Sequence, residues 1–104
     1  MSYETIVGLN VMNDEKYNQY RILIAPLLTK YKGGFRYDFK IKETLISENS
    51  DEINRLFLIY FYSRDLRDSF FADSEYLKIK KEFFSVAVTS TSIISEYERS
   101  EIFH

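Results

Sequence analysis

The hydrophobic period of the chain switches between two residues and about 3.6, in an order that few folds accommodate. Residues 3–12 and 35–42 have a hydrophobic period of about two, as is typical of strands. Residues 55–63 and 86–97 also read as strands, the last because it is rich in Val, Thr, Ser and Ile. Between the first and second segments, and between the third and fourth, apolar residues recur at three- and four-residue steps instead, as along one side of a helix. The order strand, helix, strand, strand, helix, strand predicts an α+β, ferredoxin-like sandwich with four antiparallel strands and helices on one face.

The first helical segment carries its own start and stop signals. The Asn-Asp pair at 13–14 can cap it by accepting from free backbone N–H groups. Pro26 falls inside the pattern, so the helix either kinks there or stops near Ile24 and restarts at the proline. Gly33 and Gly34 follow it, and glycine after a helix predicts a left-handed terminator.

The second helical segment reads as two pieces. Ser63 can cap the first piece, and the sequence Ala72-Asp73-Ser74 interrupts it before a second cap. Residues 75–84 then place aromatic and aliphatic side chains along one side, where they are expected to join the core.

Residues 35–42, FRYDFKIK, alternate aromatic or aliphatic side chains with charged ones. They are expected to form a hairpin with the 55–63 strand, centred near residue 49, with Asp38 opposite Tyr60 and Phe39 opposite Ile59. The aromatic parity is then expected to pack under the helices. The charged parity is expected to face away from them, toward a second subunit.

The size of the chain allows one core. Its 104 residues predict a single domain over 1–97 and a C-terminal tail over 98–104. Nine Tyr and nine Phe are more rings than one small core needs, so some are expected at an interface or in a cleft.

Charge and composition limit the classes of partner that the chain is expected to bind. The formal net charge is −2 with both signs interspersed, which argues against a nucleic-acid surface because phosphate binding needs clustered Lys and Arg. There is no Cys, which excludes disulfides and Cys-ligated zinc. With neither a basic apolar leader nor a run of about 20 apolar residues, we expect a cytoplasmic protein that does not enter membranes.

No catalytic or metal motif stands out. A catalytic serine needs a neighbouring base, and the only histidine is the terminal His104, so we predict no cofactor, no metal and no assigned catalytic residue. The best candidate site is a row of mixed polar side chains on the second, third and first strands, suited to a small polar or aromatic ligand or to a wet dimer interface. These ligand-binding candidates are Asn10, Arg36, Asp38, Lys40, Tyr60 and Tyr62.

Several short segments resemble the dimeric α/β-barrel superfamily, and within it the family catalogued as domain of unknown function 1330. The similar features span residues 5 to 95. They are DEKYNQY at the start of the first helix, the single Pro26, Tyr31 with glycine close behind, Glu43 and Leu45 after strand two, FYSRD after strand three, and DSEYLKIK in the last helix.

The resemblance implies a homodimer in which two uncovered sheets face each other, with a cleft between sheet and helices or at the barrel mouth. Superfamily members include cofactor-free monooxygenases, haem-degrading enzymes and metabolite-binding proteins, so the fold does not select one activity. The chain departs from the family pattern where Asp38, Phe39 and Lys40 replace Arg-Gly-Gly, and where Tyr60 replaces an acidic residue.

Three functions follow as hypotheses. The first is a dimer that binds a small molecule. The second is a cofactor-independent monooxygenase or isomerase of an aromatic or enolic substrate, in which Asp38 with a raised pKa is the base and Tyr60 positions the substrate. The third is a structural interaction module without a pocket.

Overall fold

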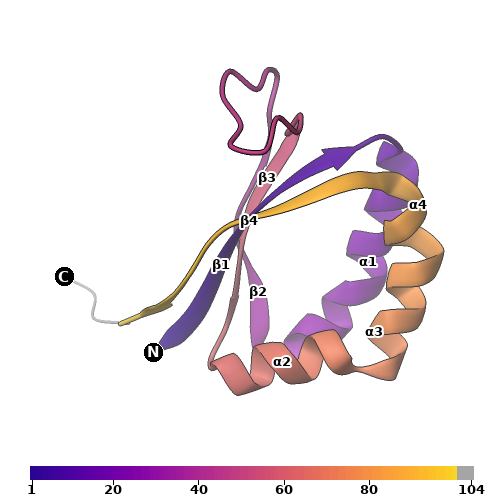
Figure 1. Cartoon of the computed structure of the whole chain (residues 1–104). Helices are drawn as coiled ribbons and strands as arrows, with labels where there is room; N and C mark the ends of the chain where they lie inside the picture. The colour runs from indigo at the N-terminus through magenta and orange to yellow at the C-terminus, as the bar shows by residue number, and fades with distance from the viewer. Residues whose placement is uncertain (101–104) are drawn as a thin grey trace.

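The computed structural model describes residues 1–100, so His104 and most of the predicted tail lie outside the described residues. One four-stranded antiparallel sheet has the order β2-β3-β1-β4 (Figure 1). Its strands are β1 (Ser2–Val11), β2 (Gly33–Lys40), β3 (Arg55–Phe61) and β4 (Val88–Arg99). The predicted ferredoxin-like α+β class is confirmed.

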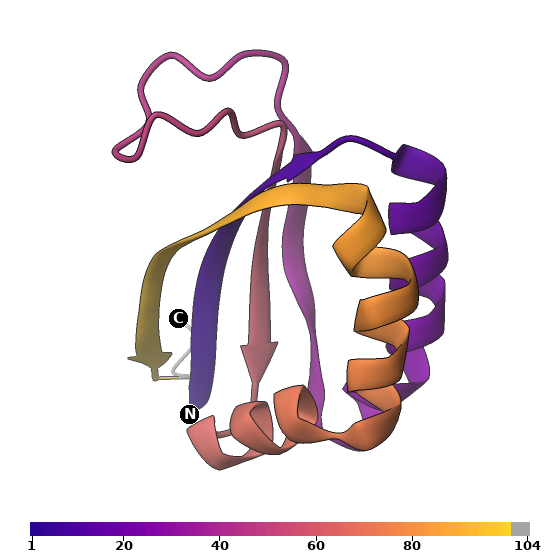
Figure 2. The same cartoon turned by 45° about the vertical axis from the view of Figure 1, so that its right-hand side comes forward.

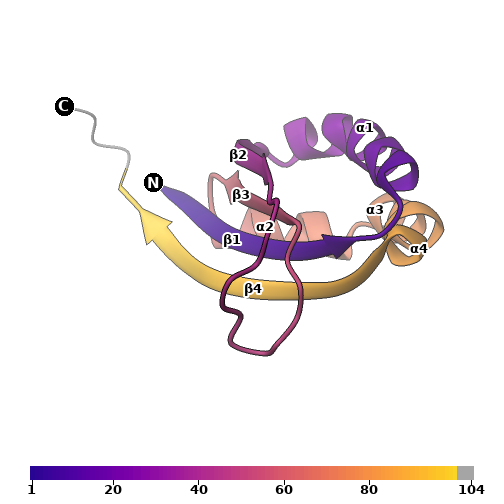
Figure 3. The ribbon, with the colours of Figure 1, turned by 90° about the horizontal axis from the view of Figure 1, so that it is seen from above.

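The helices cover one face of this sheet and leave the other uncovered (Figures 2 and 3). They are α1 (Asp14–Lys30), α2 (Arg64–Ala72), α3 (Ser74–Ile79), the π-helical turn η1 (Lys80–Phe84) and α4 (Ser85–Ala87). None of the helices within residues 1–100 is both long and apolar enough to cross a membrane.

The predicted helix caps are confirmed. The Asn13 side chain accepts from the Lys16 N–H at 3.0 Å, and the Ser63 hydroxyl accepts from the Leu66 N–H at 3.2 Å. Asp73 ends α2 and caps α3, accepting from the Glu75 N–H at 2.8 Å. The interruption between the two pieces therefore has a local chemical cause.

The structure rules out one of the two alternatives predicted for α1 at Pro26, and the end of the helix differs from the prediction. The helix runs through Pro26 to Lys30 without stopping near Ile24, because packing of its buried face outweighs one lost hydrogen bond. The left-handed residue after it is Lys32, with φ 56°, and neither glycine has a positive φ. Gly33 and Gly34 begin β2 instead.

The core lies between the sheet and the helices. Alternate residues of β1 and β3 supply its floor, and the apolar stripe of α1 supplies much of its roof. The buried hydrophobic residues, other than Tyr3 at one end of β1, are Val7, Leu9, Val11, Tyr17, Tyr20, Ile24, Leu27, Leu28, Phe57, Ile59, Phe61, Phe70, Tyr76 and Ala87.

The predicted hairpin register is wrong, because Phe35 and not Phe39 lies opposite Ile59, and a β-bulge then interrupts the pairing. Phe35 pairs with Ile59, but Tyr37 pairs with Leu58, so Arg36 is an extra residue between them. Asp38 pairs with Phe57, and Gly34 lies opposite Tyr60. Because one extra residue exchanges the two faces of a strand, the parity that packs under the helices changes along β2.

Because of the bulge, only part of FRYDFKIK packs as predicted. Phe35 packs against the core as predicted, but Tyr37 and Phe39 remain 57% and 49% exposed. Their rings stack with centroids 5.8 Å apart on the uncovered face, opposite Leu58 and Leu56. Beyond the bulge, aromatic side chains therefore face away from the helices, while Asp38 faces them.

A 14-residue connection between β2 and β3 covers one end of the uncovered face (Figure 3). Asn54 fixes its end, because its side chain donates to the Val11 carbonyl and accepts from the Val11 N–H, both at 2.8 Å. Ile53 lies close over Gly8, where an added Cβ would come within 2.9 Å of it. Leu45 and Ile46 in this loop are 83% and 93% exposed.

Candidate functional site

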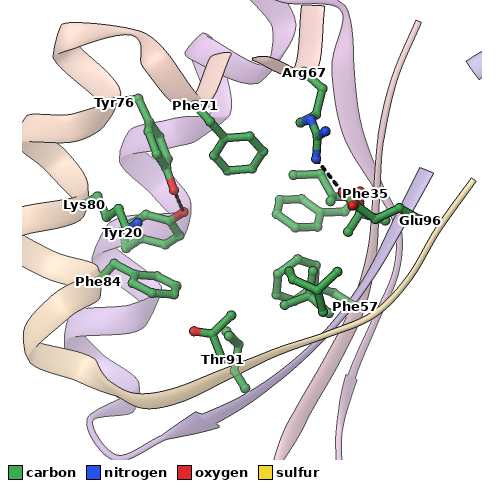
Figure 4. Close-up of a pocket in the computed structure, with 15 residues that line it drawn as sticks. Tyr20, Phe35, Phe57, Arg67, Phe71, Tyr76, Lys80, Phe84, Thr91 and Glu96 are labelled. Atoms are coloured by element: carbon green, nitrogen blue, oxygen red, sulfur yellow. Dashed lines mark hydrogen bonds and ion pairs between the residues drawn. The ribbon is translucent and has the colours of Figure 1, made fainter. Parts of the chain in front are cut away.

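A cavity of about 270 Å³ lies between the sheet and the helices (Figure 4). Every strand and the α1, α2, α3 and η1 segments contribute to its wall. The lining residues are Thr5, Val7, Leu9, Tyr20, Phe35, Phe57, Ile59, Arg67, Phe71, Tyr76, Lys80, Phe84, Thr91, Ile93 and Glu96. Six aromatic rings with a few polar groups are the usual make-up of a small-molecule site.

The helical wall combines rings with two hydroxyl groups. The Tyr20 and Tyr76 hydroxyls hydrogen-bond at 2.9 Å, and both side chains are buried. Burial raises the pKa of both phenols; for Tyr20 the neighbouring Tyr76 raises it further. Both hydroxyls are therefore protonated at neutral pH. The Phe84 ring packs on Tyr20 with centroids 5.0 Å apart.

The opposite side of the cavity is the sheet and its edge strand. Phe35 and Phe57 pack edge to face at 5.2 Å in its floor. Arg67 on α2 pairs with Glu96 on β4 at 2.5 Å, joining helix and strand beside the cavity (Figure 4). Phe71 and Ile93 are 37% and 58% exposed, so the cavity reaches the surface between α2 and β4.

The family resemblance implied a cleft between sheet and helices, but sequence reasoning missed the residues that line this one because they look like core. Tyr20 and Tyr76 lie on apolar helix faces, and their burial confirms that expectation. The one available signal was the four-residue spacing of Tyr76, Lys80 and Phe84. A regular α-helix rotates residues four apart gradually away from one line, whereas the wider π turn reverses that drift and keeps all three on the cavity wall.

The six predicted ligand-binding residues do not form one cluster. Asn10 accepts from Asn54 at 3.2 Å, and Lys40 pairs with Asp14 at 3.7 Å on the exposed surface. Tyr62 is 57% exposed beside Lys32. None of the six lines the cavity. A ligand role for them stays a prediction.

Asp38 has a different environment from the one predicted. It accepts from Arg21 at 2.6 Å and from Arg55 at 2.9 and 3.0 Å. Partial burial works to raise its pKa, but the hydrogen bonds and charges of the two arginines prevail and lower it. The predicted raised pKa is wrong, and a carboxylate held in its charged form is a weaker proton acceptor.

Arg36 and Tyr60 do meet, on the uncovered face, where the guanidinium carbon lies 4.1 Å from the ring centroid. Arg36 also donates to Glu4 at 2.5 Å, and Arg99 approaches the same carboxylate oxygen at 3.3 Å. The Glu4 side chain is fully buried. Burial alone raises the pKa of Glu4, yet hydrogen bonds from Tyr97 and Arg36 and the Arg36 charge bring it below the ordinary value.

Metal ligands do not gather in the part of the chain that the structure describes. Within residues 1–100, no three His, Cys, Asp or Glu side chains are placed to hold a metal ion together. The chemistry available in the cavity is thus hydrogen bonding from phenolic hydroxyls, ion pairing, and packing against aromatic rings.

Solved structures resemble this chain over nearly its whole length. A protein of unknown function from Rhodopseudomonas palustris is 14% identical with TM-score 0.79, covering 97% of this chain and 84% of that one. Hydroxynitrile lyase from Passiflora edulis is 17% identical with TM-score 0.67, covering 99% and 97%. A dimeric protein of unknown function with a ferredoxin-like fold from Bacteroides fragilis is 17% identical with TM-score 0.58, covering 94% and 96%.

At these low identities, the likeness shows a shared fold alone. A comparison with curated proteins gives no match. Residues 4–97 match the family model described as Domain of unknown function (DUF1330), which is nearly the whole chain. The chain therefore belongs to the DUF1330 family.

Proposed function

We propose that this protein binds a small, largely apolar molecule in the cavity between sheet and helices. The observation that carries the proposal is a concave space of about 270 Å³ lined by six aromatic rings yet furnished with hydroxyl and charged groups. A well-packed core of this size has few voids larger than a water molecule. The volume lies just below the range of drug-sized pockets, which favours a small ligand.

We also propose that the protein works as a homodimer through its uncovered sheet face. Tyr37, Phe39 and Ile94 are about half exposed, and contiguous exposed apolar surface is unusual on a monomer. The Bacteroides fragilis relative in fold is described as dimeric, which supports the same assembly here. A closed two-fold contact buries this face on both copies.

Binding is tested first with the protein as purified. Native mass spectrometry of fresh protein is expected to reveal a retained small molecule. If the molecule is lost during purification, a thermal-shift screen is expected to find small aromatic compounds that stabilise the protein. A purely structural interaction module would retain nothing and respond to no compound.

A cavity-filling variant locates the site. Thr91→Phe places a ring into the cavity from the edge strand and is expected to abolish binding, whereas Thr89→Phe, on the same strand outside the cavity, is expected to preserve it. Equal binding by both variants would place the ligand elsewhere. Loss in Asp38→Asn with retention in Thr91→Phe would instead favour the polar row predicted from the sequence.

A further inference from the structure

The tyrosine pair in the cavity has one hydrogen to spare. Two hydroxyls carry two protons, and the single Tyr20–Tyr76 hydrogen bond uses one of them. Within residues 1–100, the remaining O–H has no acceptor from the protein. Both side chains are more than nine-tenths buried and line the cavity, so this donor is available to a molecule bound there. An unmade hydrogen bond in such a place is costly, and a ligand oxygen would satisfy it.

The charges around the cavity do not balance. Arg67 is already engaged by Glu96 at 2.5 Å and by Asp68 at 2.8 Å. Lys80 is exposed and has no carboxylate partner among the described residues, and its ammonium nitrogen lies 6.0 Å from the centroid of the Phe84 ring. The lining thus presents one uncompensated positive charge.

The spare hydroxyl and the spare charge belong to the same wall. Tyr76 and Lys80 are one helical turn apart, and Figure 4 shows Lys80 beside Tyr20 on the helical side of the cavity. The sheet side of the cavity carries aromatic rings, those of Phe35 and Phe57. A molecule that fills this space needs a flat apolar body and, at one end, an anionic oxygen.

We propose that the cavity takes a small aromatic monocarboxylate, whose ring packs between Phe84 and Phe35 and whose carboxylate accepts from the Tyr20–Tyr76 pair and pairs with Lys80. This inference rests on the proposed function and narrows its ligand class. A cationic ligand would be repelled by the Lys80 ammonium group, and a neutral aromatic ligand would form no ion pair with it.

The experiment compares ligands of the same shape that differ in charge and in one terminal group, an oxygen in the acid and an NH2 in the amide. Benzoate and 2-naphthoate are titrated against benzamide and 2-naphthamide, the neutral carboxamides of the same shape, by isothermal calorimetry or NMR. Each carboxylate is expected to bind at least about tenfold more tightly than its amide, as a charge-assisted hydrogen bond predicts. The corresponding arylmethylamines are expected to bind more weakly still.

Variants assign the preference to named groups. Lys80→Gln keeps the stem and is expected to remove most of the roughly tenfold preference for the carboxylate. Lys78→Gln, an exposed lysine on α3 outside the cavity, is the matched control and is expected to change nothing. Tyr76→Phe retains the ring and is expected to weaken carboxylate binding. If Tyr76→Phe folds poorly, Lys80→Gln at its exposed position still decides the outcome.

The two proposals fail differently. If the amides bind as tightly as the acids and Lys80→Gln has no effect, the carboxylate assignment is overturned while binding in the cavity stands. If no probe binds and the native protein retains no molecule, the proposed function itself is overturned.

Discussion

At the scale of single residues, a buried carboxylate on the uncovered sheet face, that of Glu4, contributes to the stability of the fold. Glu4 is fully enclosed by side chains from three strands, including Arg36 and Arg99. A charge in that position is tolerated only because both arginines and Tyr97 supply hydrogen bonds and opposite charge. The charge state of Glu4 should therefore be visible in the stability of the protein.

Glu4→Gln is expected to lower the free energy of unfolding at neutral pH by about 1–2 kcal/mol, because the charged hydrogen bonds are lost while both arginines stay partly exposed. The pKa of Glu4 is lower in the folded protein than its ordinary value of 4.5. Its stabilisation is thus fully present above pH 4.5 and disappears as the pH falls through the folded-state pKa.

Urea denaturation between pH 7 and pH 3 tests this. The difference between wild type and Glu4→Gln should shrink on acidification. Glu98→Gln, an exposed neighbour on β4, is the control. A difference that stays constant down to pH 3 would show that the Glu4 charge does not stabilise the fold.

At the scale of elements, the join between α1 and β2 depends on the absence of a side chain. A Cβ on Gly33 would lie 2.6 Å from the Phe61 ring and 2.8 Å from the Tyr60 carbonyl oxygen. Both are fixed parts of the neighbouring strand. The glycine is needed for close packing, because its φ is not positive.

Gly33→Ala is accordingly expected to destabilise the protein by about 1–3 kcal/mol through overpacking. Gly8→Ala is the matched control, because its Cβ would meet only the Ile53 side chain, at 2.9 Å, in a surface loop that can shift. Midpoints of chemical denaturation compare the two. A smaller effect at Gly33 than at Gly8 would contradict this account.

The elements also show which features a single sequence can predict. Caps at Asn13, Ser63 and Asp73 are local chemistry, and local patterns predicted them correctly. The bulge at Arg36 is not local, because it depends on how β2 meets β3 across a long loop. The bulge places Asp38 on the helix side, and the displaced register, with Gly34 opposite Tyr60, separates Asp38 from Tyr60.

The residues that line the cavity could not be predicted for a related reason, although the family resemblance implied a cleft between sheet and helices. The rings that line the cavity satisfy the same periodicity as core residues, and whether facing rings touch or leave space depends on the spacing of helices and sheet. The π turn at 80–84 contributes to that spacing, and hydrophobic periodicity gives no direct signal of it. The six polar candidates were predicted from strand alternation, but the structure distributes them over both faces of the sheet and the end of the β2–β3 loop.

For the whole molecule, the uncovered sheet face is the surface that we propose to form the homodimer. Phe39→Glu places a charge on that face, and we expect it to convert a homodimer into a monomer. Ile22→Glu, at a 72% exposed position on α1, is the control and should leave the dimer intact. Light scattering after size exclusion is expected to give about twice 12.5 kDa for wild type and control. A monomeric wild type would overturn the proposed dimer.

Binding in the cavity is the central claim, and NMR mapping of a bound probe tests it most directly. Amide spectra of the full chain are recorded during titration with 2-naphthoate. The largest shifts are expected at residues around the cavity, including Tyr76, Lys80, Phe84 and Thr91. Shifts confined to 36–40 and 60–62, or no shifts at millimolar probe, would contradict the account.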